Sequence, residues 1–174
     1  MTLLDTNNCV IRKATVQDGK YMWQRVKDSQ KLDVNSAYCY IMLSEYFTDT
    51  CLVAEIDKEI VGFVTSLIRP SNPEVLFVWQ IAVSTEHQGK GIAYTLLHEL
   101  ISSASCTEVR YIETTISPRN TASNQLFRKW AEEMEAPLLE SEGFSSYLFP
   151  GDVHEDERLI QIGPINQQLG GTHS

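Results

Sequence analysis

The alternation of hydrophobic and polar positions divides the chain into short extended segments and longer amphipathic ones. Strict alternation or a short continuous apolar run is typical of β-strands, and apolar residues recurring every three or four positions are typical of helices. The first pattern predicts strands over residues 9–13, 51–56, 60–67, 75–83, 110–116, 138–149 and 158–162. The second predicts helices that begin near residues 15, 36, 91 and 120 and end near residues 28, 46, 104 and 136. This order of elements predicts an α/β fold.

Two neighbouring segments carry the clearest patterns. Residues 75–83 are almost continuously apolar, which predicts a strand that is buried on both faces at the middle of a sheet. In the segment after Gly91, apolar residues such as Leu96, Leu97 and Leu100 recur at helical spacing. We therefore expect a central strand followed directly by a helix with one buried face.

The length and composition of the chain are those of one globular domain. It has 174 residues, of which 43% are hydrophobic and 21% are charged. We expect the domain to cover residues 1–165 and the polar residues 166–174 to form a flexible tail.

The net charge restricts the possible partners. With 14 Lys and Arg residues against 23 Asp and Glu residues, the formal charge is −9, and a surface of this sign repels nucleic acids and anionic membranes. A bound phosphate group therefore needs a local binding device. We find neither an export signal nor an apolar stretch that is long enough to cross a bilayer, so we expect a cytoplasmic protein without nucleic-acid or membrane partners.

The four cysteines suggest neither a metal site nor a disulfide framework. Cys9, Cys39, Cys51 and Cys106 form no C-x-x-C pair and have no histidine at ligand spacing. We expect them to be reduced thiols in a cytosolic protein that binds no metal.

The hexapeptide QGKGIA at residues 88–93 joins the predicted central strand to the helix that follows it. Its two glycines allow a tight turn that leaves N–H groups pointing outward at a helix N-terminus, where they can bind a phosphate. A glycine turn that only starts the helix is the simpler alternative. A dinucleotide-binding loop is disfavoured because G-x-G-x-x-G is incomplete and no acidic residue lies at the expected distance.

With this hexapeptide the chain resembles the Gcn5-related N-acetyltransferase (GNAT) family. Gln88, Gly91 and Ala93 match the family's acyl-CoA pyrophosphate loop, Gln/Arg-x-x-Gly-x-Gly/Ala. A second family motif, Asn-x-x-Ala-x-x-Leu-Tyr, aligns with residues 120–127. The order of elements matches as well, so the resemblance covers about residues 11–164.

The resemblance implies a mixed, mostly antiparallel sheet that is splayed near its middle strands and flanked by helices. Acetyl-CoA is the implied cosubstrate and inserts at the splay, where its pantetheine arm pairs with strand backbone and one N–H group polarises the thioester carbonyl. A homodimer is implied by the family alone. The implied cofactor-binding residues are Ile81, Ala82, Val83, Gln88, Gly89, Lys90, Gly91, Ile92, Ala93, Asn120, Ser123 and Phe127.

Phe127 departs from the family motif, which has a tyrosine at this position. Many relatives use that tyrosine as the general acid for the leaving thiolate, so here the proton must come from another group or from water. A thiolate whose conjugate acid has a pKa of about 8.5 leaves without strong protonation. We expect Phe127 only to pack against the pantetheine arm.

Four segments, at residues 33–40, 77–80, 114–120 and 154–157, together resemble a branch of the family that acetylates the γ-amine of a small diamino acid. Such a substrate needs an anion for an ammonium group and neutral donors for its carboxylate. Residues 159–164 depart from the Tyr-Arg pair expected in this branch. The implied substrate-binding residues are Asp33, Asn35, Ser36, Tyr38, Trp79, Thr115 and Asn120.

Ordinary structural roles stay open for several of these residues. Asp33 and Ser36 also suit a loop and a helix cap, Tyr38 and Trp79 suit a core, and Thr115 suits any strand. In the functional interpretation, Asp33 binds an ammonium group, and Trp79 packs on the aliphatic chain or faces an ammonium group.

Attack by the amine requires a base. An amine with a pKa of about 10 is neutral in only about one molecule in a thousand at pH 7, a cost of about 4 kcal/mol. Glu157 and His154 are the candidates, and we favour Glu157 because its carboxylate also attracts the ammonium group. Glu155 and Asp156 are interpreted as surface charges. Cys39 is disfavoured as an acyl carrier because the resemblance implies direct transfer.

Two alternative functions stay open. The chain could acetylate another small amine, such as a polyamine or an aminoglycoside, or it could be a non-catalytic regulator that binds acyl-CoA. Thiol release from acetyl-CoA in the presence of different amines separates these alternatives.

Overall fold

The structure is a computed structural model that describes residues 8–166. It contains two compact units: unit 1 holds the described residues up to Leu67 together with Gln80–Cys106, and unit 2 holds Ile68–Trp79 together with the described residues from Thr107 onward. The expected domain over residues 1–165 stays a prediction, and residues 167–174 of the expected tail lie outside the described residues. Within 8–166, none of the helices has the length and apolar character needed to cross a membrane.

Unit 1 is built on an antiparallel arrangement of strands. β1 pairs with β2, and β2 pairs with β3. Asp57 and Lys58 have φ values of 50° and 67°, as a tight hairpin turn between β2 and β3 requires, so the strands expected at residues 51–56 and 60–67 form a hairpin. The strands of this unit are β1 (Cys9–Lys13), β2 (Cys51–Ile56), β3 (Glu59–Ile68) and the last residues of β4 (Val75–Val83).

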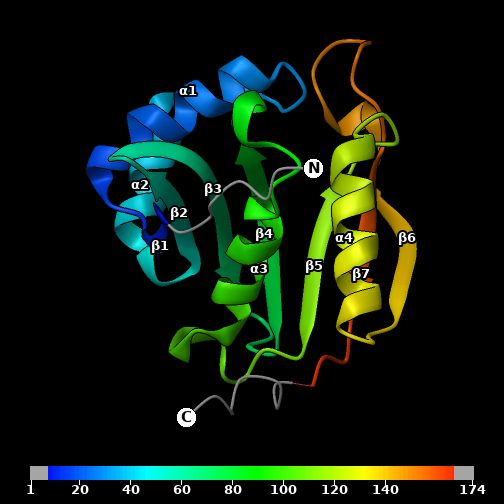
Figure 1. Cartoon of the computed structure of the whole chain (residues 1–174). Coiled ribbons are helices and arrows are strands. Elements are labelled where there is room, and N and C mark those ends of the chain that lie inside the picture. The colour runs from blue at the N-terminus through cyan, green and yellow to red at the C-terminus, as the bar shows by residue number, and fades with distance from the viewer. Residues whose placement is uncertain (1–7, 167–174) are drawn as a thin grey trace. The chain divides into compact units, whose positions relative to one another are not determined.

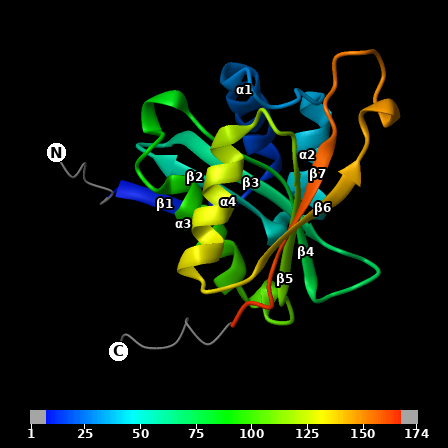
Figure 2. The same cartoon turned by 90° about the vertical axis from the view of Figure 1, so that its right-hand side faces the viewer.

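Three helices flank the strands of unit 1. Figures 1 and 2 show α3 on one face of the strands and α1 with α2 on the other. Met22 of α1, Leu43 of α2, Phe63 of β3 and Leu97 of α3 are all buried in this core. The helices are α1 (Gly19–Ser29), α2 (Ala37–Tyr46) and α3 (Ile92–Ser102).

Unit 2 combines the first part of β4 with three later strands and one helix. β7 lies between β5 and β6 and is antiparallel to both. β4 and β5 run parallel, and helix α4 covers one face of the strands (Figures 1 and 2). The later elements are β5 (Tyr111–Ile116), α4 (Thr121–Glu133), β6 (Leu138–Phe144) and β7 (Glu157–Ile162).

The strand order is β1-β2-β3-β4-β5-β7-β6, with β4 shared by the two units. This confirms the predicted α/β fold with a mixed, mostly antiparallel sheet, and β4 occupies the predicted central position. The parallel register joins Val75–Phe77 to Tyr111–Glu113, and the described register stops there although both strands continue. A register that ends at Phe77 and Glu113 is what a splay between the two strands requires.

Several predicted boundaries are wrong: α1 begins at Gly19 after a 3-10 turn, α4 ends at Glu133, and two further boundaries have a clear structural cause. The strand expected over residues 138–149 ends at Phe144, because its register becomes irregular and a 3-10 turn at Ser146–Leu148 follows. Asp156 holds this turn through a hydrogen bond from the Ser146 amide to its Oδ1 atom, at 2.7 Å. Helix α3 ends at Ser102, short of residue 104, because a 3-10 turn at Ala104–Cys106 replaces its last turn.

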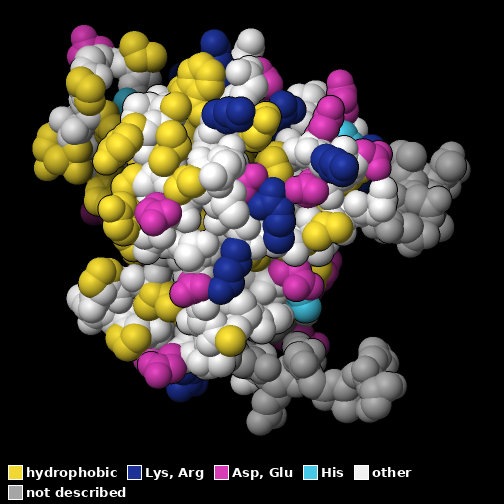
Figure 3. Space-filling model, turned by 90° about the vertical axis from the view of Figure 1, so that its left-hand side faces the viewer, with side chains coloured by type: hydrophobic (Ala, Val, Ile, Leu, Met, Phe, Trp, Pro, Cys, Tyr) yellow, Lys and Arg dark blue, Asp and Glu magenta, His cyan; other side chains and the backbone are white. Residues whose placement is uncertain are grey.

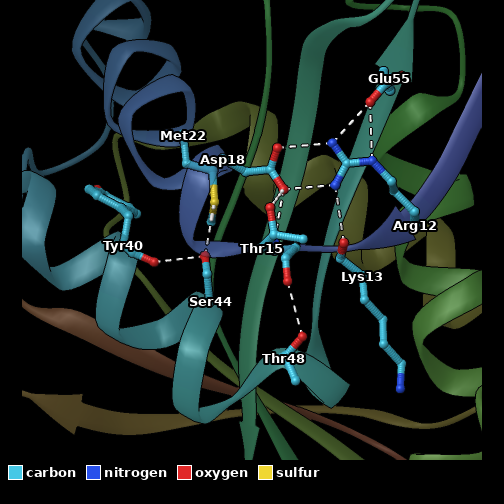
Figure 4. A network of polar contacts seen from close by, with 10 residues as sticks. Arg12, Lys13, Thr15, Asp18, Met22, Tyr40, Ser44, Thr48 and Glu55 are labelled. Carbon is cyan, nitrogen blue, oxygen red and sulfur yellow. Dashed lines mark hydrogen bonds and ion pairs between the residues drawn. The ribbon is translucent and has the colours of Figure 1, made fainter.

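A buried carboxylate joins β1 to the start of α1 (Figure 4). Asp18 accepts hydrogen bonds from the Arg12 guanidinium at 2.7 and 2.9 Å and from the Thr15 amide at 2.8 Å. Glu55 of β2 binds the same guanidinium at 2.9 Å. Thr15 and Asp18 form a capping box at the 3-10 turn Val16–Asp18 that precedes α1. Burial alone raises the pKa of Asp18, but the hydrogen bonds from Arg12 and Thr15 outweigh it and hold that pKa below its usual value.

Candidate active site

The glycine loop between β4 and α3 adopts a conformation that other residues rarely take. Gly89 and Gly91 have φ values of 75° and 81°, and no atom lies within 4 Å of the position that a Cβ atom would occupy at either residue. Gly91 is the N-cap of α3, and no side chain caps the first turn of that helix. The first amides of α3 therefore lack a side-chain cap at the positive end of the helix, which suits a phosphate.

Three side-chain hydrogen bonds fix the shape of this loop. Gln88 Nε2 donates to the Val83 carbonyl at 3.1 Å, and Ser84 Oγ lies 2.8 Å from His87 Nδ1. Thr95 Oγ1 donates to the Gly91 carbonyl at 3.0 Å. The roles of Ser84 and Thr95 were missed by sequence reasoning, although a serine three residues before a histidine and a threonine in a first helical turn are both plausible capping signals. Lys90 is half-buried and supplies a positive charge within the loop.

The remaining cofactor candidates lie on β4 and α4. Ile81 and Ala82 are buried in unit 1, and Val83 is half-buried at the end of β4. In unit 2, Asn120 caps α4 by accepting a hydrogen bond from the Ser123 amide at 3.2 Å. The roles of these residues in cofactor binding stay predictions.

Phe127 is buried in unit 2, at 2% exposure, on the same helix as the buried Trp130. It has no hydroxyl group, so it cannot supply the proton that the family's tyrosine supplies. Its contact with a pantetheine arm stays a prediction.

The loop before α2 and the start of that helix carry four of the substrate candidates. Asp33 and Ser36 are exposed, and Asn35 is half-buried. Ser36 is the N-cap of α2, yet its side chain makes no capping hydrogen bond. Tyr38 is 74% exposed, so its alternative role as a core residue is excluded. The structure therefore groups these polar side chains at one end of α2.

In unit 2, the register of the strands places three further candidates on one face. Phe77 faces Glu113, so Trp79 and Thr115, two residues further along each strand, share that face. Thr115 faces Leu159 of β7, which puts Glu157 on the same face as a diagonal neighbour. Trp79, Thr115 and Glu157 are half-buried. The opposite face is apolar and buried, and its residues include Leu76, Val78, Ile112, Ile116 and Ile160.

His154 is held by an aromatic ring and a carbonyl group. Its ring stacks on Phe149, with centroids 3.6 Å apart and an angle of 5° between the planes. Its Nδ1 lies 2.7 Å from the Glu155 carbonyl oxygen, which can only accept, so Nδ1 carries a hydrogen. In the neutral ring the lone pair is then on Nε2, the form that a general base needs.

The two acidic residues between the base candidates have structural roles. Glu155 binds the Arg119 side chain at 2.9 Å and also accepts from the Arg119 amide at 3.3 Å. Asp156 holds the Ser146 turn described above. The interpretation of both residues as surface charges stays a prediction.

Metal binding and cysteine chemistry receive no support from the described part of the chain. Residues 8–166 contain no group of three or more His, Cys, Asp and Glu side chains that is arranged to hold a metal ion. Burial raises the pKa of the Cys39 thiol, which disfavours the thiolate that an acyl carrier needs. Cys51 is more deeply buried, and burial raises its pKa to about 11.

Comparison with known protein families identifies the class of the chain. Residues 20–131 match the sequence model of the acetyltransferase (GNAT) family. The chain therefore belongs to this family, and the resemblance found in the glycine loop and in the order of elements is confirmed.

Individual relatives within this family are similar to most of the chain. The chain is 50% identical to the L-2,4-diaminobutyric acid acetyltransferase of Halalkalibacterium halodurans over 163 residues, which cover 94% of this chain and 85% of the relative. It is 45% identical to the enzyme of the same name from Shouchella clausii, again over 163 residues, with 94% and 91% of the two chains covered.

A solved structure is similar over nearly the same extent. It is the diaminobutyrate acetyltransferase EctA from Paenibacillus lautus in complex with its substrate L-2,4-diaminobutyric acid and coenzyme A. The TM-score is 0.87 and the sequence identity 46%, and the match covers 90% of this chain and 95% of that chain.

Proposed function

We propose that this chain transfers the acetyl group of acetyl-CoA to the γ-amine of L-2,4-diaminobutyrate, giving N-γ-acetyl-2,4-diaminobutyrate. The observation that carries the proposal is the similarity, over most of its length, to diaminobutyrate acetyltransferases, including one solved with its diamino acid and coenzyme A. The resemblance of the sequence implies that the product enters ectoine biosynthesis, the synthesis of a compatible solute.

Acetyl-CoA binds through its pyrophosphate to the glycine loop in this proposal. The first amides of α3 donate to the phosphate oxygens, and Gly89 and Gly91 leave the approach open. Lys90 offsets part of the negative charge. The backbone of Ile81 to Val83 pairs with the pantetheine arm, and one N–H group of this stretch polarises the thioester carbonyl.

The diamino acid is recognised by charge and by shape. The Asp33 carboxylate binds an ammonium group, and Asn35, Ser36, Tyr38, Thr115 and Asn120 supply neutral hydrogen bonds. Trp79 packs on the short aliphatic chain. The exposure of Asp33 and Ser36 in the loop and of Tyr38 at the start of α2 supports these assignments, because a ligand can reach exposed polar side chains.

The base removes a proton from the γ-ammonium group before attack. Glu157 is our first candidate, and its place on the same sheet face as Trp79 and Thr115 supports this. His154 is the alternative, supported by the lone pair that its hydrogen bond assigns to Nε2. The neutral amine then attacks the thioester carbon, the C–N bond forms and the C–S bond breaks. The CoA thiolate takes its proton from water or from another group, since Phe127 has none to give.

We place the enzyme in the cytoplasm and expect it to act as a homodimer. The four cysteines are all free thiols, which suits a reducing compartment. Figure 3 views the molecule from the side of α1 and α2 and shows hydrophobic side chains gathered on it. An exposed apolar patch is typical of a protein interface. On α2 and the loop before it, the exposed large hydrophobic residues are Val34, Tyr38, Ile41 and Tyr46.

Thiol release from acetyl-CoA with a panel of amines tests the proposal. We expect the highest kcat/KM with L-2,4-diaminobutyrate. Higher kcat/KM with a polyamine or an aminoglycoside would reassign the substrate. Tight acetyl-CoA binding without thiol release from any amine would favour a regulator.

A further inference from the structure

Gln80 is a buried side chain of β4 that sequence reasoning did not assign to the site. It is 7% exposed, and its amide joins two segments of unit 1. The Tyr40 hydroxyl donates to Gln80 Oε1 at 2.8 Å, and Gln80 Nε2 donates to the Asp33 carbonyl oxygen at 2.9 Å. One amide group therefore connects helix α2, strand β4 and the loop that carries the Asp33 carboxylate.

The chemistry of the partners allows only one orientation of this amide. The Asp33 carbonyl can only accept a hydrogen bond, so it must face the NH₂ end of Gln80. The Oε1 end then faces Tyr40, whose hydroxyl can donate. Burial raises the pKa of Tyr40, which keeps that hydroxyl protonated at neutral and mildly alkaline pH. Both ends of the amide are satisfied, and reversing it would set Oε1 against the Asp33 carbonyl oxygen and lose that hydrogen bond.

On the side of α2 and β4, packing and hydrogen bonds hold Tyr40 and Gln80 in place. Tyr40 is fully buried, and its ring lies edge-on to Phe63 at a centroid distance of 6.0 Å. Ser44 Oγ donates to the Tyr40 carbonyl at 2.8 Å, as Figure 4 shows. The backbone N–H of Gln80 donates to Thr65 Oγ1 at 3.2 Å, and Thr65 Oγ1 donates to the Gln80 carbonyl at 3.3 Å. The amide therefore has a fixed place before it reaches the loop.

This link joins the loop to the protein interior. Residues 30–36, between α1 and α2, contain no helix or strand, and Asp33 and Val34 are exposed. Within the loop, Asn35 Nδ2 also donates to the Asp33 carbonyl, at the longer distance of 3.4 Å. The direction of the Asp33 carboxylate follows from its backbone, and the hydrogen bond from Gln80 fixes that backbone from the protein interior.

We propose that Gln80 and Tyr40 are positioning residues that hold the Asp33 loop in the geometry needed to bind the ammonium group of the diamino acid. This inference rests on the proposed function, in which Asp33 makes that contact. Neither residue touches the substrate in this role. They act through the Asp33 backbone, so their loss should weaken binding of the amine and spare binding of acetyl-CoA.

Steady-state kinetics of Gln80→Met and Tyr40→Phe test the role. Gln80→Met keeps the length of the side chain without its hydrogen bonds, and Tyr40→Phe keeps the ring. Each should raise KM for L-2,4-diaminobutyrate roughly 3- to 10-fold, the effect of one lost hydrogen bond, and leave KM for acetyl-CoA within about twofold. Thr50→Val is the matched control. It removes a buried hydroxyl that donates to the Ser66 carbonyl at 2.8 Å, so it loses a comparable bond without touching the loop.

A double variant separates positioning from general destabilisation. If Gln80 acts through Asp33, adding Gln80→Met to Asp33→Ala should leave KM for the diamino acid where Asp33→Ala alone puts it. The proposal would be overturned if Gln80→Met raised KM for the diamino acid in the Asp33→Ala variant by the same factor as in the wild-type chain. Unchanged KM in folded Gln80→Met and Tyr40→Phe would also overturn it, as would an equal rise of KM in Thr50→Val.

Hydrogen exchange provides a readout that does not depend on activity. The amides of residues 31–36 should exchange faster in Gln80→Met than in the wild-type chain and in Thr50→Val. Unchanged exchange in this segment would contradict the positioning role, whichever amine is the substrate. Failure of the wild-type chain to acetylate L-2,4-diaminobutyrate would instead contradict the proposed function. If Gln80→Met does not fold, both the kinetics and the hydrogen exchange are measured on Tyr40→Phe.

Discussion

Replacing Gly91 with valine should abolish acetyl-CoA binding while leaving the protein folded. Gly91 is the N-cap of α3 and has a φ of 81°, a conformation that β-branched residues rarely adopt. The proposed pyrophosphate site lies at the amides that follow it. A valine side chain would project into the space that the phosphate needs and would also bias the turn away from the conformation that presents these amides.

The effects of Gly91→Val on folding and on acetyl-CoA binding can be worked out separately. No atom lies within 4 Å of the position of a Cβ atom at Gly91, so the folding cost is limited to backbone strain of about 1–3 kcal/mol. This is small against a typical stability of about 5–15 kcal/mol. Binding loses about two charge-assisted hydrogen bonds of roughly 1.5–3 kcal/mol each, which weakens acetyl-CoA affinity by roughly 10²- to 10⁴-fold.

Gly151→Val is the matched control for this prediction. Gly151 has a φ of 80° and the same open surroundings, but it lies in the connection between β6 and β7. Thermal unfolding should show similar destabilisation of both variants, and calorimetric titration with acetyl-CoA should show lost binding in Gly91→Val alone. Wild-type affinity in a folded Gly91→Val protein would refute the placement of the pyrophosphate at this loop.

Three further predictions concern the substrate, the base and the stability of the fold. Asp33→Ala should raise KM for L-2,4-diaminobutyrate about 10- to 100-fold in steady-state assays with acetyl-CoA affinity unchanged, since a charge-assisted contact is worth about 1.5–3 kcal/mol; a wild-type KM would leave Asp33 as a loop residue. Glu157→Gln should lower kcat by about 10²- to 10⁴-fold between pH 7 and 9, and loss of kcat in His154→Ala alone would assign the base to His154. Hydrogen bonds lower the pKa of Asp18 in the folded state, so the Asp18 carboxylate stabilises the fold at pH values above its usual pKa of 3.8, and this stabilisation is lost as the pH falls through the lowered pKa. Urea unfolding at pH 7 and pH 3 should therefore show a smaller loss of stability in Asp18→Asn than in the wild type. Equal losses in the two proteins would contradict this.

The elements around the cofactor loop could be predicted because their signals are local. Residues 75–83 form one apolar run, and the structure gives β4 the same bounds. The glycines of the loop indicate a turn with a backbone conformation that only glycine adopts easily, and Gly89 and Gly91 do have positive φ values. Strand and helix periodicity depend on neighbouring residues, so one sequence suffices to detect them.

The polar links that organise the substrate loop could not be predicted in this way. Gln80 and the Asp33 carbonyl are 47 positions apart, and a side-chain amide that bonds a distant backbone group leaves no periodic pattern. Helix α2 has apolar residues on all sides, so its sequence does not show that Tyr40 is buried and Tyr38 exposed. The early end of β6 also depends on a distant residue, Asp156, whose carboxylate holds the turn that follows.

The position of the acetyl group in the product tests the central claim most directly. Incubation with acetyl-CoA that carries ¹³C in the acetyl carbonyl and with L-2,4-diaminobutyrate gives a product that long-range carbon–proton NMR can assign. The account predicts that the labelled carbonyl correlates with the γ-methylene protons. Correlation with the α-methine proton, or no labelled amide at all while acetyl-CoA binds, would contradict it.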